Sequence, residues 1–121
     1  MTIKIWKSNP PYSDTPIKVL REHSSSVISL LYIKERDIML SSGSRDETLR
    51  LWNMSTYQCI TVIEGVYCCS TNSLYQIDKD RVIVGERETF LIVNIDKCVN
   101  REDNRIWNIT VCWLFSKVKR K

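Results

Sequence analysis

The sequence has few of the residues that build most small-molecule sites. Its 121 residues include only 3 glycines, 3 prolines and 1 histidine. Walker loops and dinucleotide-binding turns each need several glycines at fixed spacing, and no such pattern is present. The low Gly and Pro content also excludes collagen-like and disordered chains. We therefore expect one folded unit that binds no cofactor.

Long apolar runs and paired cysteines are missing as well. No stretch approaches the ~20 apolar residues of a membrane helix, and the N-terminus lacks the basic-then-apolar order of a signal peptide. The 5 cysteines include no Cys-x-x-Cys pair, and 1 histidine adds too little for a zinc site. We expect reduced thiols, no metal, no membrane contact and an intracellular location, cytoplasmic or nuclear.

The charge is mildly positive and dispersed. Eighteen Lys and Arg against 14 Asp and Glu give a net charge of +4, which favours solubility over nucleic-acid affinity. The dense basic cluster lies in residues 117–121 and is typical of a solvated end. We expect no nucleic-acid partner.

The strongest local pattern lies in residues 38–54 and predicts a β-hairpin. An apolar run ends in Ser and Gly, and the polar residues 45–47 form the turn, where Asp bonds the backbone just ahead of it. After the turn, Leu49 and Leu51 alternate with other side chains and so share one face.

Two further strands flank this hairpin. Residues 27–33 and 59–63 are rich in β-branched and large apolar side chains and are bounded by polar segments. Four short strands without a helical period predict one antiparallel meander. Because both of its faces are apolar, it must lie between neighbouring layers.

The hairpin pattern recurs along the chain. Residues 2–7 match residues 48–53 position by position at an offset of 46, and residues 89–94 form a third copy at a further 41. Both offsets lie near the ~40–45 residue repeat of four-stranded propeller blades.

The segments Leu-Arg-Glu-His at 20–23 and Ser-Gly-Ser-Arg-Asp-Glu-Thr-Leu-Arg-Leu-Trp-Asn at 42–53 resemble a WD repeat. The family's Gly-His is here Glu22-His23, and its Trp-Asp is Trp52-Asn53. The resemblance implies an all-β fold made of antiparallel four-stranded blades of an incomplete WD-repeat β-propeller, about two and a half blades. The expected divisions are the end of a first blade at 1–20, a complete WD-repeat blade at 21–63, a degenerate blade at 64–101, and the start of a further blade or a tail at 102–121.

The resemblance also implies a buried polar network of His23, Ser42, Asp46 and Trp52. Its chemistry is self-consistent: the carboxylate accepts from one imidazole nitrogen, the other nitrogen accepts from the hydroxyl, and the hydroxyl oxygen accepts the indole N–H. Ser44 lies on the same side of its strand as Ser42 and is the alternative hydroxyl partner.

The third copy has lost these polar residues. The offset places Arg87 where the second copy has Asp46, and the strand match places Val66 where it has His23. We expect packing there to rest on apolar contact, at roughly 25 cal/mol per Å² buried.

Asp, His and Ser are also the members of a hydrolase triad, so an enzyme is the rival interpretation. His23 is the only histidine and cannot serve both the blade and a substrate, and no Gly-x-Ser-x-Gly elbow is present. We expect no enzyme and no catalytic residue.

The resemblance implies a protein–protein interaction scaffold or adaptor. Ser26, Ile28 and Arg45 correspond to rim positions that the family uses for partners, although Arg45 could be a solvated turn residue and Ile28 a core residue. Propellers need four to eight blades to close. We therefore expect a fragment or truncated form of a larger propeller. The alternatives are a self-assembling protomer of a shared ring, which would be a homo-oligomer through exposed blade faces, and, in another class, a propeller enzyme or a nucleic-acid-binding module.

Overall fold

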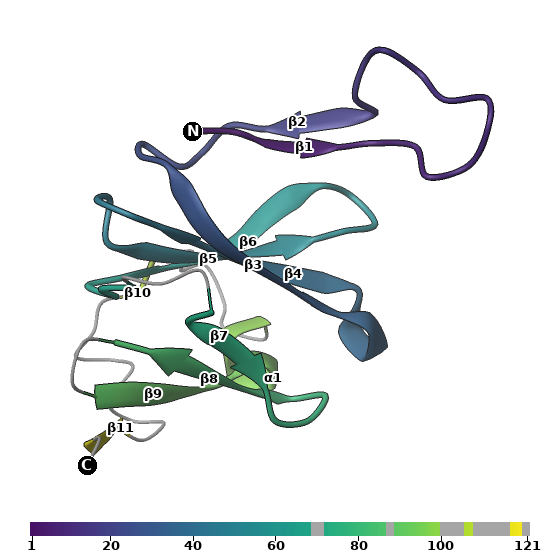
Figure 1. Cartoon of the computed structure of the whole chain (residues 1–121). Coiled ribbons are helices and arrows are strands. Elements are labelled where there is room, and N and C mark those ends of the chain that lie inside the picture. Colours follow the sequence, from purple (N-terminus) through teal and green to yellow (C-terminus); the bar gives the residue numbers. More distant parts are fainter. Residues whose placement is uncertain (69–71, 87–88, 100–105, 108–116, 120–121) are drawn as a thin grey trace.

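The described part of the chain is almost entirely β-structure (Figure 1). The structure is a computed structural model that describes residues 1–68, 72–86, 89–99, 106–107 and 117–119. Its strands are β1 (Ile3–Ile5), β2 (Lys18–Leu20), β3 (Val27–Ile33), β4 (Ile38–Gly43), β5 (Thr48–Asn53), β6 (Gln58–Glu64), β7 (Leu74–Gln76), β8 (Arg81–Gly85), β9 (Thr89–Asn94), β10 (Ile106–Trp107) and β11 (Lys117–Lys119). A 3-10 turn, η1 (Lys34–Arg36), follows β3, and one short helix, α1 (Ile95–Val99), follows β9.

The strands form three sheets that follow one another in space (Figure 1). The first sheet holds β1 and β2, the second has the order β10-β6-β5-β4-β3, and the third has the order β11-β9-β8-β7. Every pair of neighbouring strands is antiparallel except β10 and β6, which are parallel. The predicted all-β class, with antiparallel four-stranded blades, is confirmed.

The second sheet is covered on both faces, as its apolar pattern requires. All residues of β4 are buried, and Leu49 and Leu51 of β5 are fully enclosed. The leucine face packs against the third sheet in one core cluster. The opposite face carries Met39 and Trp52 and packs against Ile3 of the first sheet in a second cluster. Period-two alternation thus assigns each side chain of β5 to one of two interfaces.

The turn between β4 and β5 depends on a glycine. A Cβ placed on Gly43 would collide with the carboxylate of Asp46. Any other residue at position 43 would therefore displace that carboxylate, which fixes the side chain of Asp46 over the end of β4. Glu47 completes the turn with a φ of 56°.

Polar contacts also tie the second sheet to the third. Arg36 of η1 forms ion pairs with Asp80 and with Asp96 of α1. The side-chain amide of Gln76 donates to Glu35 at 3.1 Å. These contacts are partly exposed, so they orient the two sheets more than they stabilise them.

The C-terminal region differs from its prediction. Residues 102–121 were expected to start a further blade or to form a tail, but β11 pairs with β9 and so becomes the fourth strand of the third sheet. Strand β10 pairs with β6 instead. Hydrogen bonding at two sheet edges decides this arrangement, and a strand pattern alone does not reveal which edge a strand joins.

Neither helix in the described residues has the length and apolarity that a membrane crossing requires.

Candidate functional site

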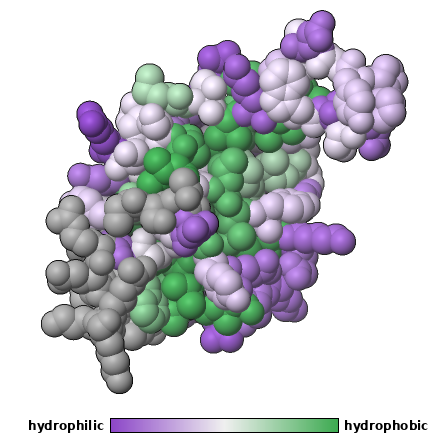
Figure 2. Space-filling view, in the orientation of Figure 1, coloured by the Kyte–Doolittle hydropathy of each residue, from purple (hydrophilic) through white to green (hydrophobic). Residues whose placement is uncertain are grey.

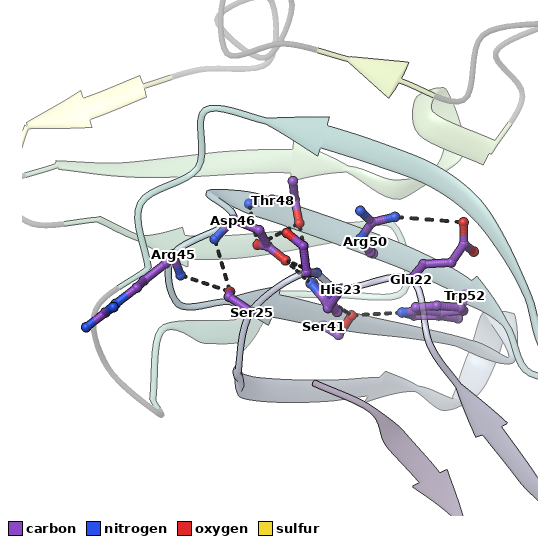
Figure 3. A network of polar contacts seen from close by, with 10 residues as sticks. Glu22, His23, Ser25, Ser41, Arg45, Asp46, Thr48, Arg50 and Trp52 are labelled. Atoms are coloured by element: carbon purple, nitrogen blue, oxygen red, sulfur yellow. Dashed lines mark hydrogen bonds and ion pairs between the residues drawn. The ribbon is translucent and has the colours of Figure 1, made fainter.

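A chain of buried hydrogen bonds joins the entry to β3 with β4 and β5 (Figure 3). His23 lies just before β3, and its Nδ1 is 2.8 Å from Oδ2 of Asp46. Its Nε2 is 2.6 Å from the hydroxyl oxygen of Ser41. The indole Nε1–H of Trp52 donates to the same oxygen at 2.8 Å. The chain therefore runs from carboxylate to imidazole to hydroxyl to indole.

The donors and acceptors of this chain have one consistent assignment. An ionised carboxylate only accepts, so Nδ1 of His23 carries the proton and donates to Asp46. Nε2 then has a lone pair and accepts the Ser41 O–H, while the Ser41 oxygen accepts from Trp52. Each buried group is satisfied, as burial demands.

Asp46 is held by more than the histidine. Its Oδ1 accepts from the Thr48 hydroxyl at 2.9 Å and from the Thr48 backbone N–H at 3.1 Å. Its Oδ2 also accepts the backbone N–H of Ser24 at 3.2 Å. Thr48 was not among the predicted network residues, although an Asp side chain commonly bonds the backbone two residues ahead of it. Asp46 thus fastens the turn and the entry to β3 together.

Burial and hydrogen bonding set the charges of the pair. Burial lowers the pKa of His23 below its usual 6.5, against the hydrogen bond and charge of Asp46, which raise it. Burial opposes ionisation of Asp46, but the hydrogen bonds from His23 and Thr48 outweigh it and hold the pKa of the carboxyl below its usual 3.8. At neutral pH the imidazole is therefore neutral and the carboxylate charged.

We expect the free energy of unfolding to fall as the pH drops from 7 to 5. Unfolded chains take up a proton at His23 near pH 6.5, whereas burial keeps the folded imidazole neutral to lower pH. Acid therefore favours the unfolded state over this window, at up to about 1 kcal/mol per pH unit. Urea unfolding at several pH values measures this slope.

The control for this pH dependence is His23→Gln. Because the chain has 1 histidine, the variant should be flat from pH 7 to 5. Carboxyl groups such as Asp46, whose pKa lies below 3.8 in the folded state, act only at lower pH. An equal slope in the variant and the wild type would contradict the assignment.

The hydroxyl of the network comes from Ser41, and the prediction of Ser42 is wrong. In the register of β4 and β5, Ser41 lies opposite Arg50 and so shares a face with Trp52. Ser42 lies opposite Leu49 on the other face. A shift of one residue along a strand reverses the side of the sheet. Ser44, the alternative, is exposed in the turn.

In the third sheet, Glu86 makes a contact like that of Asp46 with the backbone of Ser24. Glu86 was not among the predicted residues. Oε2 of Glu86, a buried residue, accepts the backbone N–H of Tyr67 at 3.5 Å. In the second sheet Asp46 contacts Ser24, the residue after His23, in the same way. Three residues separate β8 from β9, whereas four residues separate β4 from β5. Glu86 therefore takes the place that the offset gave to Arg87, which lies outside the described residues.

The predicted rim residues do not all have the same environment. Arg45 and Ser26 are exposed, and hydrogen bonds join the segments 24–26 and 44–46 in which they lie. The hydroxyl of Ser25 accepts the backbone N–H groups of Arg45 and Asp46, both at 3.0 Å. Ile28 is half-buried at an irregular point of the β3–β4 ladder and packs against the core.

This arrangement is poorly suited to nucleophilic catalysis. Ser41, the hydroxyl in contact with the imidazole, is fully buried, so a substrate carbonyl has no path to it. In the part of the chain that the structure describes, no group of three or more His, Cys, Asp or Glu could hold a metal ion. The geometry instead supports a structural clamp.

Comparisons with known proteins agree with the fold. No protein-family model matches the sequence. The nuclear distribution protein nudF of Aspergillus niger is 36% identical over 65 residues, which cover 54% of this chain and 14% of the relative. The ribosome biogenesis protein ytm1 of Neurospora crassa is 33% identical over 66 residues, 54% of this chain and 14% of the relative. Among solved structures, the C-terminal WD40 domain of Sif2 superimposes with a TM-score of 0.52 at 16% identity, over 68% of this chain and 23% of that one.

The sheets and the clamp define a protein built from propeller blades. With the repeat at 20–53 and the likeness to the WD40 domain of Sif2, the chain has the fold of WD-repeat β-propeller blades and is similar in sequence to part of nudF. It spans 14% of the length of its curated relatives nudF and ytm1.

Proposed function

We propose that the protein is a non-catalytic scaffold whose rim, residues 24–26 and 44–46, binds another protein. The observation that carries this proposal is a pair of hydrogen bonds. The Ser25 hydroxyl accepts the backbone N–H groups of Arg45 and Asp46, while the Arg45 side chain is exposed. A second bond, from the backbone N–H of Ser44 to the carbonyl of Ser26 at 2.8 Å, closes the same surface. A backbone fixed in advance loses little entropy on binding, and arginine is enriched among residues that dominate interfaces.

The buried clamp serves this rim. Asp46 bonds to His23 and Ser24 on one segment and lies directly after Arg45 on the other. The polar network therefore holds the two rim segments in a fixed relative position. Its hydrogen bonds have a structural role and not a catalytic one. Ile28 contributes through the core beneath the rim more than through direct contact.

The test is a charge reversal, Arg45→Glu. We expect the proteins that co-purify specifically with the wild-type chain, quantified by mass spectrometry, to be depleted with the variant. With the purified partner, the affinity should fall about tenfold or more. The melting temperature should stay unchanged because Arg45 is exposed.

The matched control for this test is Lys79→Glu. Lys79 is also exposed and lies in the turn between β7 and β8, so the change in charge is the same. An interface at the proposed rim predicts normal binding for this variant. Equal binding by the wild type and Arg45→Glu would contradict the proposal.

We also propose that these blades act within a larger propeller. The support is the 14% of the relatives' length that the chain spans, together with the four to eight blades that closure needs. The alternative is a ring shared by copies of this chain. It is favoured by an open groove of about 370 Å³ between β1 and β3, lined by Thr2, Ile3, Lys4, Val27, Ile28, Ser29 and Leu30. A discrete oligomer in light scattering would favour the shared ring over the larger propeller.

Other classes have less support. A propeller enzyme would need reactive groups that a substrate can reach, and Ser41 and His23 are both buried. A nucleic-acid-binding module would need a basic stripe with interleaved aromatic residues, which the dispersed charges do not form. We place the protein inside the cell because its relatives are named for nuclear distribution and ribosome biogenesis.

A further inference from the structure

The loop between β1 and β2 carries a concentration of exposed apolar side chains. Figures 1 and 2 show it projecting from the sheets at one end of the molecule. Trp6 is 49% exposed, Tyr12 73% and Ile17 56%. Large apolar side chains scattered singly on a surface are ordinary, but several on one projecting loop mark an interaction site.

The tip of this loop reads Asn9-Pro10-Pro11-Tyr12, an Asn-Pro-x-Tyr sequence. Asn at the first position of a turn bonds the backbone ahead of it, and Pro at the second position fixes φ. The backbone bends at these residues and leaves the Tyr12 ring exposed. Phosphotyrosine-binding (PTB) domains recognise this sequence: they add the strand before the turn to their own sheet and bind the tyrosine that follows.

The backbone before the turn is placed for such pairing. The ladder of β1 and β2 ends at Ile5, whose carbonyl accepts the N–H of Ile17 at 2.7 Å. In the described part of the chain, residues 6–8 belong to no strand ladder. After Tyr12, the Ser13 hydroxyl accepts the backbone N–H of Thr15 at 3.2 Å. The segment is thus anchored to the sheet at Ile5, and the Ser13–Thr15 contact is a local bend within the loop. The anchored end reduces the entropy lost on docking.

We propose that residues 6–12 are a docking peptide for a phosphotyrosine-binding domain. Residues 6–8 pair with the open edge of the partner's sheet, Asn9 and Pro10 make the turn, and the Tyr12 ring fills the partner's pocket. The loop lies at the opposite end of the strands from the turn between β4 and β5 (Figure 1). This interaction is therefore independent of the rim around Arg45, and neither proposal depends on the other.

The experiment measures binding of the full 121-residue chain to a panel of purified phosphotyrosine-binding domains by calorimetry. The panel includes domains that require phosphotyrosine and domains that accept tyrosine, and the chain is tested before and after tyrosine phosphorylation. We expect micromolar affinity for at least one domain. Asn9→Ala and Tyr12→Ala should each weaken binding about tenfold or more.

Two variants serve as matched controls. Tyr75→Ala removes another exposed tyrosine, 68% exposed on β7, and Pro11→Ala changes the variable position of the motif. Both should bind within about twofold of the wild type. Circular dichroism of each variant checks that the fold is retained.

Several outcomes would overturn the proposal. One is the absence of binding to every domain of the panel in both phosphorylation states. Another is full affinity of the Asn9→Ala variant in either phosphorylation state. A domain that binds this variant recognises the phosphotyrosine without the turn. Loss of binding in Pro11→Ala would indicate a proline-reading partner, and equal loss in Tyr75→Ala and Tyr12→Ala would show that the loop is not the site.

Discussion

Trp52→Ala is expected to lower the free energy of unfolding by about 3–5 kcal/mol, the range for a buried aromatic side chain. Trp52 is 2% exposed and fills the cluster between the first and second sheets. Its indole N–H also donates to the buried oxygen of Ser41. The substitution removes both the packing and the donor. Urea unfolding followed by circular dichroism measures the loss.

The repeat supplies the control for this experiment. Trp6 occupies the position in the first copy of the sequence repeat that Trp52 occupies in the second, yet it lies just after β1 and is 49% exposed. Trp6→Ala should therefore change the stability by no more than about 0.5 kcal/mol. Trp52→Phe keeps most of the apolar surface and loses the donor, so it should cost less than alanine. A Trp52→Ala variant as stable as Trp6→Ala would contradict the packing described for the second sheet.

Ser41→Ala is expected to cost about 1–3 kcal/mol, because it leaves the imidazole Nε2 and the indole N–H without their buried partner. Ser42→Ala removes a neighbouring buried hydroxyl that has no hydrogen-bond partner within the described residues. It should leave stability within about 0.5 kcal/mol of the wild type, or raise it slightly.

This pair of variants is its own control, since the two serines are adjacent, buried and lose the same atom. Urea midpoints with equal slopes give the two differences directly. A larger cost at Ser42 would restore the assignment that the family resemblance implied and would refute the register of β4 and β5. Equal costs would contradict the hydrogen bonding described for Ser41.

Much of the fold could be predicted because it rests on local chemistry. The alternation of Leu49 and Leu51 shows that β5 has two different faces, and the apolar run of β4 shows that both of its faces are covered. The Asp46 turn follows from the preference of Asp for turns. Identifying His23, Asp46 and Trp52 needed the family resemblance as well, and the structure brings all three together.

The wrong predictions of the network residues share one cause. The sequence of one strand does not determine its register against the neighbouring strand. Alternation says that Ser41 and Ser42 face opposite sides, but only the register against β5 says which side holds Trp52. The same reasoning failed at Glu86, because a turn shorter by one residue changes the position that reaches the backbone of Tyr67. An offset between repeats assumes turns of equal length.

The sequence by itself determined the class of strands, the repeat and the polar side chains available to the clamp, because these follow from side-chain period and local turn preference. The tertiary structure decided which serine closes the clamp, that β11 completes the third sheet, and that Ser25 staples the rim beneath Arg45. Each of these depends on groups far apart in the sequence meeting at hydrogen-bonding distance. The register of the sheets and the lengths of the turns set those meetings, and no single segment encodes them.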